Sequence, residues 1–127
     1  LLSTLALAQD KKQESIEGNG KMVTKDIAVS SFDVLQASGI YELKLSQGNT
    51  ESVKIEADEN LHELFTVKNE GNTLVIDMKK MERTSLKTKN KMKVYVSFKS
   101  LKNVELSTVG NVKSDKELSF NLPLLYY

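Results

Sequence analysis

Apolar and polar residues alternate with a period of two along most of this chain. In the segment 91–98, "KMKVYVSF", Met92, Val94, Val96 and Phe98 fall on one parity and polar residues or Tyr95 on the other. This period is typical of a β-strand that buries one face. The same alternation recurs in 41–46, 51–57 and 73–79, and less regularly in 22–29 and 32–37. The pattern therefore predicts an all-β fold.

Turn-forming residues separate these segments, and one segment breaks the alternation. Gly, Asn and Ser cluster at 18–20, 38–39, 47–49 and 69–72, where they favour turns. Between 58 and 65, "DENLHELF" places leucines at helical spacing after Asp58, a residue suited to a helix N-cap. We expect one short helix near residues 58–65, packed on a sheet because it is too short to be stable alone.

The stretch 101–115, "LKNVELSTVGNVKSD", contains two very short apolar runs, Val104–Leu106 and Val109–Val112. An ordinary strand has about five or six residues, but in a solenoid each strand pairs only with the turns above and below it. Small residues at the corners would let such turns stack closely. The pattern favours a solenoid-like stack of short strands, and an antiparallel sandwich is the alternative.

Composition narrows the functional classes. The chain of 127 residues with 39% hydrophobic residues suits one domain with a modest core. Its 18 basic and 17 acidic residues nearly cancel, so no overall field demands a nucleic-acid or membrane partner. The chain has no cysteine, which excludes disulfides, thiolate metal sites and cysteine nucleophiles.

Candidate catalytic chemistry is sparse. His62 is the single histidine, and no GxSxG motif is present, so neither a metal ligand set nor a hydrolase triad can be assembled convincingly. The glycines at 18–20 lack the pattern of a phosphate loop, and Asp58, Glu59 and Asn60 lack the spacing of a calcium loop. We expect no enzyme, no metal and no cofactor.

One basic segment stands out. Between Lys79 and Lys93 the only acidic residue is Glu82. In "LKTKNKMK" the lysines alternate, so an extended strand would present them as a positive stripe to a polyanion. The alternative is a solvated connection whose lysines protect a sheet edge. Without an aromatic residue in the run, nucleic acid is not an expected partner. The stripe comprises Lys79, Lys80, Arg83, Lys87, Lys89, Lys91 and Lys93.

The N-terminal residues indicate export. "LLSTLALAQ" is an apolar run ending in Ala6-Leu7-Ala8, and a polar stretch follows it, as at a signal-peptidase site. We interpret residues 1–8 as the remnant of a signal peptide and 9–19 as a polar N-terminal segment, with a short strand or helix as the alternative for the first residues. Eight residues are too few to span a membrane. The mature protein is thus expected to be extracytoplasmic: periplasmic, cell-surface or secreted.

From Gly18 to about Asp115 the chain resembles the "Putative auto-transporter adhesin, head GIN domain" family of bacterial extracytoplasmic proteins. The likeness is carried by "GNGKMVTKDIAVSSFDVLQASGIYELKLSQG", "ESVKIEADENL", "NTLVIDMK" and "KMKVYVSFKSLKNVELSTVGNV", in that order. It implies a right-handed single-stranded β-helix over 20–121, a non-catalytic role, and binding of glycan or protein at the cell envelope. The family continues through further short turns, which implies truncation at the C-terminal end.

The last residues, 122–127, form an apolar tail, "LPLLYY". An uncovered solenoid end invites pairing with another chain. The tail is therefore predicted either to fold back as a cap or to mediate self-association, and a natural final strand is the alternative. Two functions follow: an envelope binding module, or a structural and assembly domain without a dedicated ligand.

Overall fold

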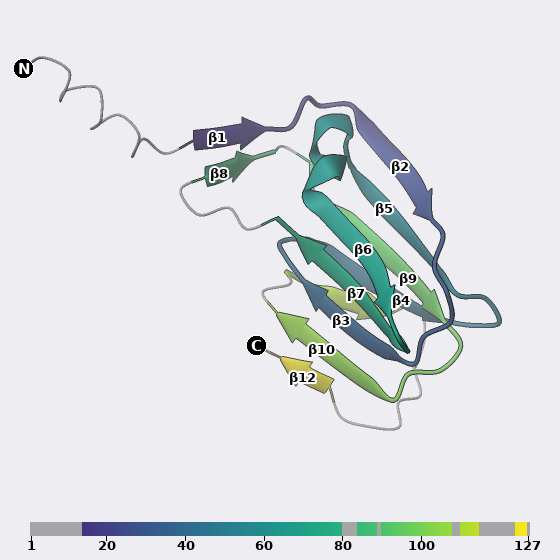
Figure 1. The fold of residues 1–127 in the computed structure, drawn as a ribbon. Helices are drawn as coiled ribbons and strands as arrows, with labels where there is room; N and C mark the ends of the chain where they lie inside the picture. Colours follow the sequence, from purple (N-terminus) through teal and green to yellow (C-terminus); the bar gives the residue numbers. More distant parts are fainter. Residues whose placement is uncertain (1–13, 80–83, 89, 108–109, 115–123, 127) are drawn as a thin grey trace, which may run out of the picture.

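The computed structural model describes residues 14–79, 84–88, 90–107, 110–114 and 124–126. The described part consists of short strands and one 3₁₀ helix (Figure 1). In chain order they are β1 (Glu14–Glu17), β2 (Met22–Ile27), β3 (Val34–Ser38), β4 (Glu42–Gln47), β5 (Ser52–Asp58), η2 (Glu59–Leu64), β6 (Phe65–Glu70), β7 (Thr73–Met78), β8 (Thr84–Lys87), β9 (Lys93–Phe98), β10 (Asn103–Ser107), β11 (Val112–Ser114) and β12 (Leu124–Tyr126).

Two five-stranded sheets form the body of the domain. The first, which we call the β3 sheet, has the order β12-β10-β3-β7-β6, and the second, the β4 sheet, has the order β11-β4-β9-β5-β2. They lie one behind the other in Figure 1, and their buried side chains form one hydrophobic cluster. A separate parallel ribbon of β1 and β8 lies beside them.

The two sheets mix parallel and antiparallel pairs. Strand β3 lies between β7 and β10, and β4 lies between β9 and β11, all in parallel. The pairs β2–β5, β5–β9 and β6–β7 are antiparallel. The β3–β4 unit therefore lies in the middle of the stack, although it precedes both neighbouring units in the sequence.

This arrangement confirms the all-β class and corrects the expected order of winding. The sequence pattern predicted coils that each cover the coil before, whereas the described units stack out of chain order and include antiparallel pairs. Within the described residues the two sheets are not closed into one wall. The reason is physical: alternation specifies which face of a strand is buried but not which strand lies beside it.

The predicted inward faces are confirmed. Val94, Val96 and Phe98 of β9 are fully or almost fully buried, as are the inward residues of β3, β4, β5 and β7. The apolar residues of β2 are only partly buried. Strands β3, β5, β7 and β9 alternate buried and less buried positions, so the core fills the space between the sheets. The apolar core comprises Phe32, Leu35, Ala37, Tyr41, Leu43, Leu45, Val53, Ile55, Ala57, Leu61, Leu64, Leu74, Ile76, Met78, Met92, Val94, Val96, Phe98, Leu101, Val104 and Leu106.

The helix expected near residues 58–65 is a 3₁₀ helix, η2, whose Leu61 and Leu64 are buried against the sheets. Asp58 does not cap it, because no side-chain cap hydrogen bond is formed. Its carboxylate instead accepts a hydrogen bond from the Gly20 N–H at 3.0 Å. The segment thus forms a tight corner between β5 and β6.

Two corners of the chain stack directly on each other. The Gly39 N–H donates to the Ser107 carbonyl at 3.3 Å, and the Gly110 N–H donates to the Tyr41 carbonyl at 3.0 Å. Gly39 has a φ of +128°, and a Cβ there would lie 2.7 Å from Cγ of Met78. The corner therefore requires glycine, in agreement with the expectation that small residues let turns stack closely. Thr108 and Val109 lie outside the described residues.

The two ends of the chain are described only in part. Leu124–Tyr126 of the apolar tail 122–127 form β12, which pairs in parallel with Val104–Leu106 of β10. The tail thus extends the β3 sheet by one strand, as in the alternative that assigned it to a strand. Residues 1–8, the segment before Glu14 and the stretch 115–123 lie outside the described residues. The predicted signal peptide and domain bounds remain predictions.

Candidate binding surface

The predicted lysine stripe does not lie along one strand. Lys79 follows β7, Lys87 ends β8, and Lys93 begins β9. Lys91 lies in the connection before β9 and is exposed. The described members therefore come from three places in the fold. Lys80, Arg83 and Lys89 lie outside the described residues.

A row of residues crosses the outward face of the β4 sheet, centred on Tyr95. In the strand register Lys44 and Lys54 lie opposite Tyr95 on its two sides. Lys113 lies opposite Lys44, and Asp26 lies opposite Lys54. The row therefore crosses the strands β11, β4, β9, β5 and β2, and Tyr95 lies at its centre with lysines on both sides. We call this surface the Tyr95 face.

Tyr95 makes one polar contact through its hydroxyl and one through the face of its ring. Its hydroxyl donates to Oε1 of Glu56 at 2.9 Å, and Nζ of Lys44 lies 5.5 Å from the ring centroid. Burial and the hydrogen bond to Glu56 raise the pKa of Tyr95, so the phenol stays protonated at neutral pH. Lys54 lies 4.0 Å from Asp26, with both side chains well exposed, which is a weak ion pair.

The neighbouring rows add charged and hydroxyl groups. Glu42, 7% exposed, pairs with Lys113 at 3.0 Å, and the hydrogen bond from Lys113 lowers the pKa of the Glu42 carboxyl. Lys93 lies opposite Glu42 and Glu56 in the register. On the other side of Tyr95, three serines form a row and line a shallow hollow of about 440 Å³ together with Lys44, Lys54, Glu56 and Tyr95. The serines are Ser46, Ser52 and Ser97.

Sequence reasoning identified Tyr95 as outward but missed its lysine neighbours. Lys44, Lys54 and Lys113 lie in three separate strands, and each looks like an ordinary polar position in its own alternating segment. Only the register across the strands brings them together. A search for charge runs along the chain cannot find such a row, because it depends on pairings of high sequence separation.

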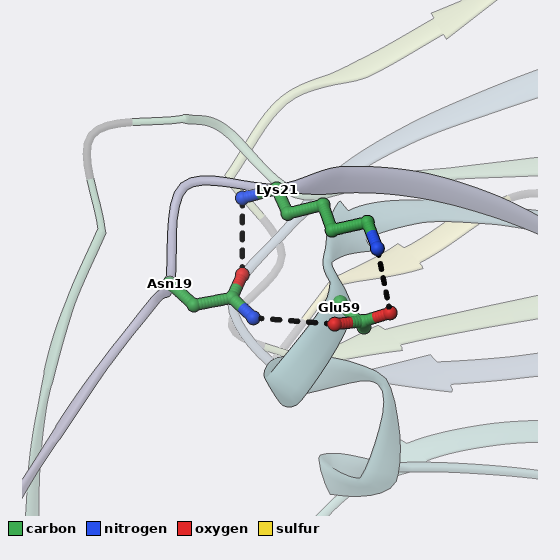
Figure 2. A network of polar contacts seen from close by, with 3 residues as sticks. All are labelled: Asn19, Lys21 and Glu59. Atoms are coloured by element: carbon green, nitrogen blue, oxygen red, sulfur yellow. Dashed lines mark hydrogen bonds and ion pairs between the residues drawn. The ribbon is translucent and has the colours of Figure 1, made fainter.

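A second group of polar residues joins the N-terminal loop to η2 (Figure 2). Oδ1 of Asn19 accepts from the Lys21 N–H at 3.0 Å, and the Asn19 amide donates to Glu59 at 3.5 Å. Nζ of Lys21 lies 3.4 Å from Glu59. These side chains bind one another, so the arrangement holds the loop at 18–20 in place and is not shaped as a phosphate site.

The single histidine also has a structural partner. Nε2 of His62 lies 2.7 Å from the Val23 carbonyl, and since a carbonyl only accepts, this nitrogen carries the proton. His62 therefore ties η2 to the edge strand β2. Among the residues that the structure describes, no three His, Asp or Glu side chains gather as a metal site would require.

The fold places the chain in the class of all-β domains built around two five-stranded sheets. More specifically, it belongs to the family described as "Putative auto-transporter adhesin, head GIN domain", whose model matches residues 31–122. The resemblance read from the sequence is thereby confirmed. That family description names an adhesin and no enzymatic activity.

Solved structures of similar fold come from species of Parabacteroides and Bacteroides. A putative adhesin from Parabacteroides merdae has 26% identity and a TM-score of 0.64, covering 80% of this chain and 42% of that protein. A putative adhesin from Bacteroides fragilis has 22% identity and a TM-score of 0.70, covering 87% of this chain and 53% of that protein. A putative lipid binding protein from Parabacteroides distasonis has 24% identity and a TM-score of 0.65, covering 80% and 43%.

The chain thus spans about half the length, or less, of these solved proteins. A comparison with curated proteins finds no match. No helix among the described residues has the length and apolar character needed to cross a membrane.

Proposed function

We propose that this chain is a non-catalytic binding domain of the bacterial cell envelope that contacts glycan through the Tyr95 face. The observation that carries the proposal is the row in which Tyr95 lies between Lys44 and Lys54 on an open sheet. The family description as an adhesin supports a binding role.

The chemistry of the face suits a sugar chain. An aromatic ring offers an apolar surface to the C–H face of a sugar, and its polar tip offers a hydrogen bond. Lysine ammonium groups donate to hydroxyl or carboxylate oxygens, and serine hydroxyls both donate and accept. Because the groups project from paired strands, little backbone freedom remains to be lost on binding.

The finer points of the proposal concern shape and location. The parallel stacks β7-β3-β10-β12 and β9-β4-β11 support a solenoid-like arrangement for this part of the chain. An extracytoplasmic location, after cleavage of a signal peptide at residues 1–8, agrees with the adhesin description of the family. Self-association through the tail 122–127 belongs to the alternative function.

A glycan array with the purified domain tests the proposal. We expect reproducible binding to envelope glycans, and Tyr95→Ala and Lys44→Ala should each remove most of it. Lys99→Ala is the matched control, since Lys99 is exposed and does not line the hollow around Tyr95. Lys91→Glu measures the contribution of the predicted stripe. Binding that survives Tyr95→Ala would overturn the assignment to this face.

The alternative is a structural domain that assembles without a dedicated ligand. It is favoured by β12, a strand from the apolar tail that pairs at the end of the β3 sheet. Silence on the array, together with assembly that grows with concentration in sedimentation velocity, would support it. Binding to glycan by a strictly monomeric protein would count against it.

A further inference from the structure

A second hollow lies where the corners of the two sheets meet. It is lined by the corner 38–42, the end of β7 at 77–79, Leu86 of β8 and residues of the connection into β9. Ser107, Gly110 and Asn111 complete the lining. Its volume is about 860 Å³, within the range of roughly 300–1,000 Å³ of ligand-binding pockets. It shares no lining residue with the hollow on the Tyr95 face. We call it the corner groove.

The groove has an apolar lining that includes an exposed side chain. Ile40 is 56% exposed, and it is the one large hydrophobic residue of the described chain with such exposure. Leu86 is half-buried, and Met78 and Met92 lie beneath the surface. Methionine side chains adapt readily to the shape of an apolar ligand. The groove can therefore take up hydrocarbon, and Ile40 gains burial when it does.

The two carboxylates that line the groove, Asp77 and Glu42, already have partners within the protein. Oδ1 of Asp77 already accepts hydrogen bonds from the Ser38 hydroxyl at 2.6 Å and the Met78 N–H at 2.8 Å. Glu42 is paired with Lys113.

Lys79 and Lys91 also line the groove and are exposed. Neither forms an ion pair with another described residue. Since Glu42 is neutralised by Lys113, the two lysines outnumber Asp77, the one remaining carboxylate of the lining. The net charge at the groove is therefore positive, which favours an anionic group.

Tyr41, which also lines the groove, supplies a further observation. Its hydroxyl is buried, and within the described part of the chain it has no hydrogen-bond partner. Burial, with Asp77 nearby, raises the pKa of this phenol, so it remains a donor. A buried donor without a partner is uncommon in native proteins, and this one belongs to a residue that lines the groove.

We infer that the corner groove binds a single-chain amphiphile with an anionic head group, of the class of long-chain carboxylates. The hydrocarbon chain lies against Ile40 and Leu86, and the head group meets Lys79 and Lys91. The combination of an exposed apolar side chain with two lysines that form no ion pair among the described residues fits such a ligand better than a neutral or cationic one.

Isothermal titration calorimetry tests the inference with dodecanoate, kept below its critical micelle concentration. We expect saturable binding by the wild-type domain. Dodecyltrimethylammonium, which has the same chain and the opposite charge, should bind at least about tenfold more weakly. Ile40→Ser and Lys91→Glu should each weaken dodecanoate binding about tenfold, whereas Lys99→Glu should leave it unchanged. Circular dichroism melting of each variant confirms that it is folded.

The outcomes that overturn the inference are clear. They are no binding of dodecanoate, equal affinity for the cationic amphiphile, or full binding by folded Ile40→Ser. Tyr95→Ala separates this site from the proposed function, because it should remove glycan binding and leave dodecanoate binding unchanged. Failure of one proposal is thus distinguishable from failure of the other.

Discussion

Oδ2 of Asp58 accepts a hydrogen bond from the Gly20 N–H at 3.0 Å, and Asp58 is only 1% exposed. This contact joins the loop before β2 to the start of η2. Removing the acceptor leaves a part-buried N–H without a partner, which costs about 1–3 kcal/mol. We expect Asp58→Ala to lower the free energy of unfolding by about that amount in urea titrations. Asp26→Ala, at a side chain 81% exposed, should change it by less than about 0.5 kcal/mol.

Two glycine variants test the constraint on the corner at Gly39. Gly39→Ala would place a Cβ against Met78 at a φ of +128°, and strain of this kind costs about 1–3 kcal/mol. Gly48→Ala meets no atom within 4 Å, so it should be neutral or stabilise the fold by up to about 1 kcal/mol. Thermal melts of the two variants measure the contrast. Equal melting temperatures would show that the corner is not constrained as described.

Glu42 predicts an acid-dependent loss of stability. The hydrogen bond from Lys113 holds the pKa of the Glu42 carboxyl below its ordinary value of 4.5. The stabilisation is therefore complete above pH 4.5 and is lost as the pH falls through the lowered pKa of the folded state. Lys113→Met should flatten this part of the stability profile.

Melting temperatures of wild type and Lys113→Met, measured from neutral to acidic pH, should converge on the acid side. An NMR titration in which Glu42 ionises at or above 4.5 would contradict the prediction. Lys68→Met is the control, because Lys68 pairs with the exposed Glu70.

Tyr41 predicts a gain of stability on removal of a polar group. Its buried hydroxyl has no partner among the described residues, so Tyr41→Phe removes an unsatisfied group and keeps the ring contact with Phe65, whose centroid lies 5.8 Å away. We expect the free energy of unfolding to rise by up to about 1–2 kcal/mol. Tyr95→Phe, which removes a hydroxyl bonded to Glu56, should instead be neutral or mildly destabilising in the same assay.

The raised pKa of Tyr41 adds a pH signature to this variant. Because burial raises the pKa of the folded-state phenol above 10.0, its contribution is present below that pH and is lost as the pH rises further. Wild type should therefore lose stability above about pH 10 more steeply than Tyr41→Phe. Parallel alkaline profiles for the two proteins would show that Tyr41 is not the group responsible.

Much of the strand content could be read from the sequence because the strands alternate cleanly. The inward residues of β4, β5, β7 and β9 are the buried ones in the structure. Strand β6 was missed because Phe65 and Val67 alone carry its apolar pattern, and both are only partly buried. Strand β8 was missed because the basic run looked like a connection.

The candidate surface was less accessible to sequence reasoning. Tyr95 could be placed on the outward face by parity, but its neighbours Lys44 and Lys54 depend on register. The same limit applies to the order of winding, since parity says nothing of which strands pair. In the sequence Asp58 fits the pattern of a helix N-cap. Only the folded structure shows that its carboxylate binds the Gly20 N–H instead.

The central position of the β3–β4 unit has a consequence for the nascent chain. Both edges of β3 and β4 are covered by strands made later, from Thr73 onward. During synthesis the edges of β3 and β4 therefore remain unpaired until these later strands have been made. Such delayed closure slows folding and leaves an interval in which misassembly with other chains competes. If the domain were exported unfolded, folding would begin with all strands present, and this interval would not arise.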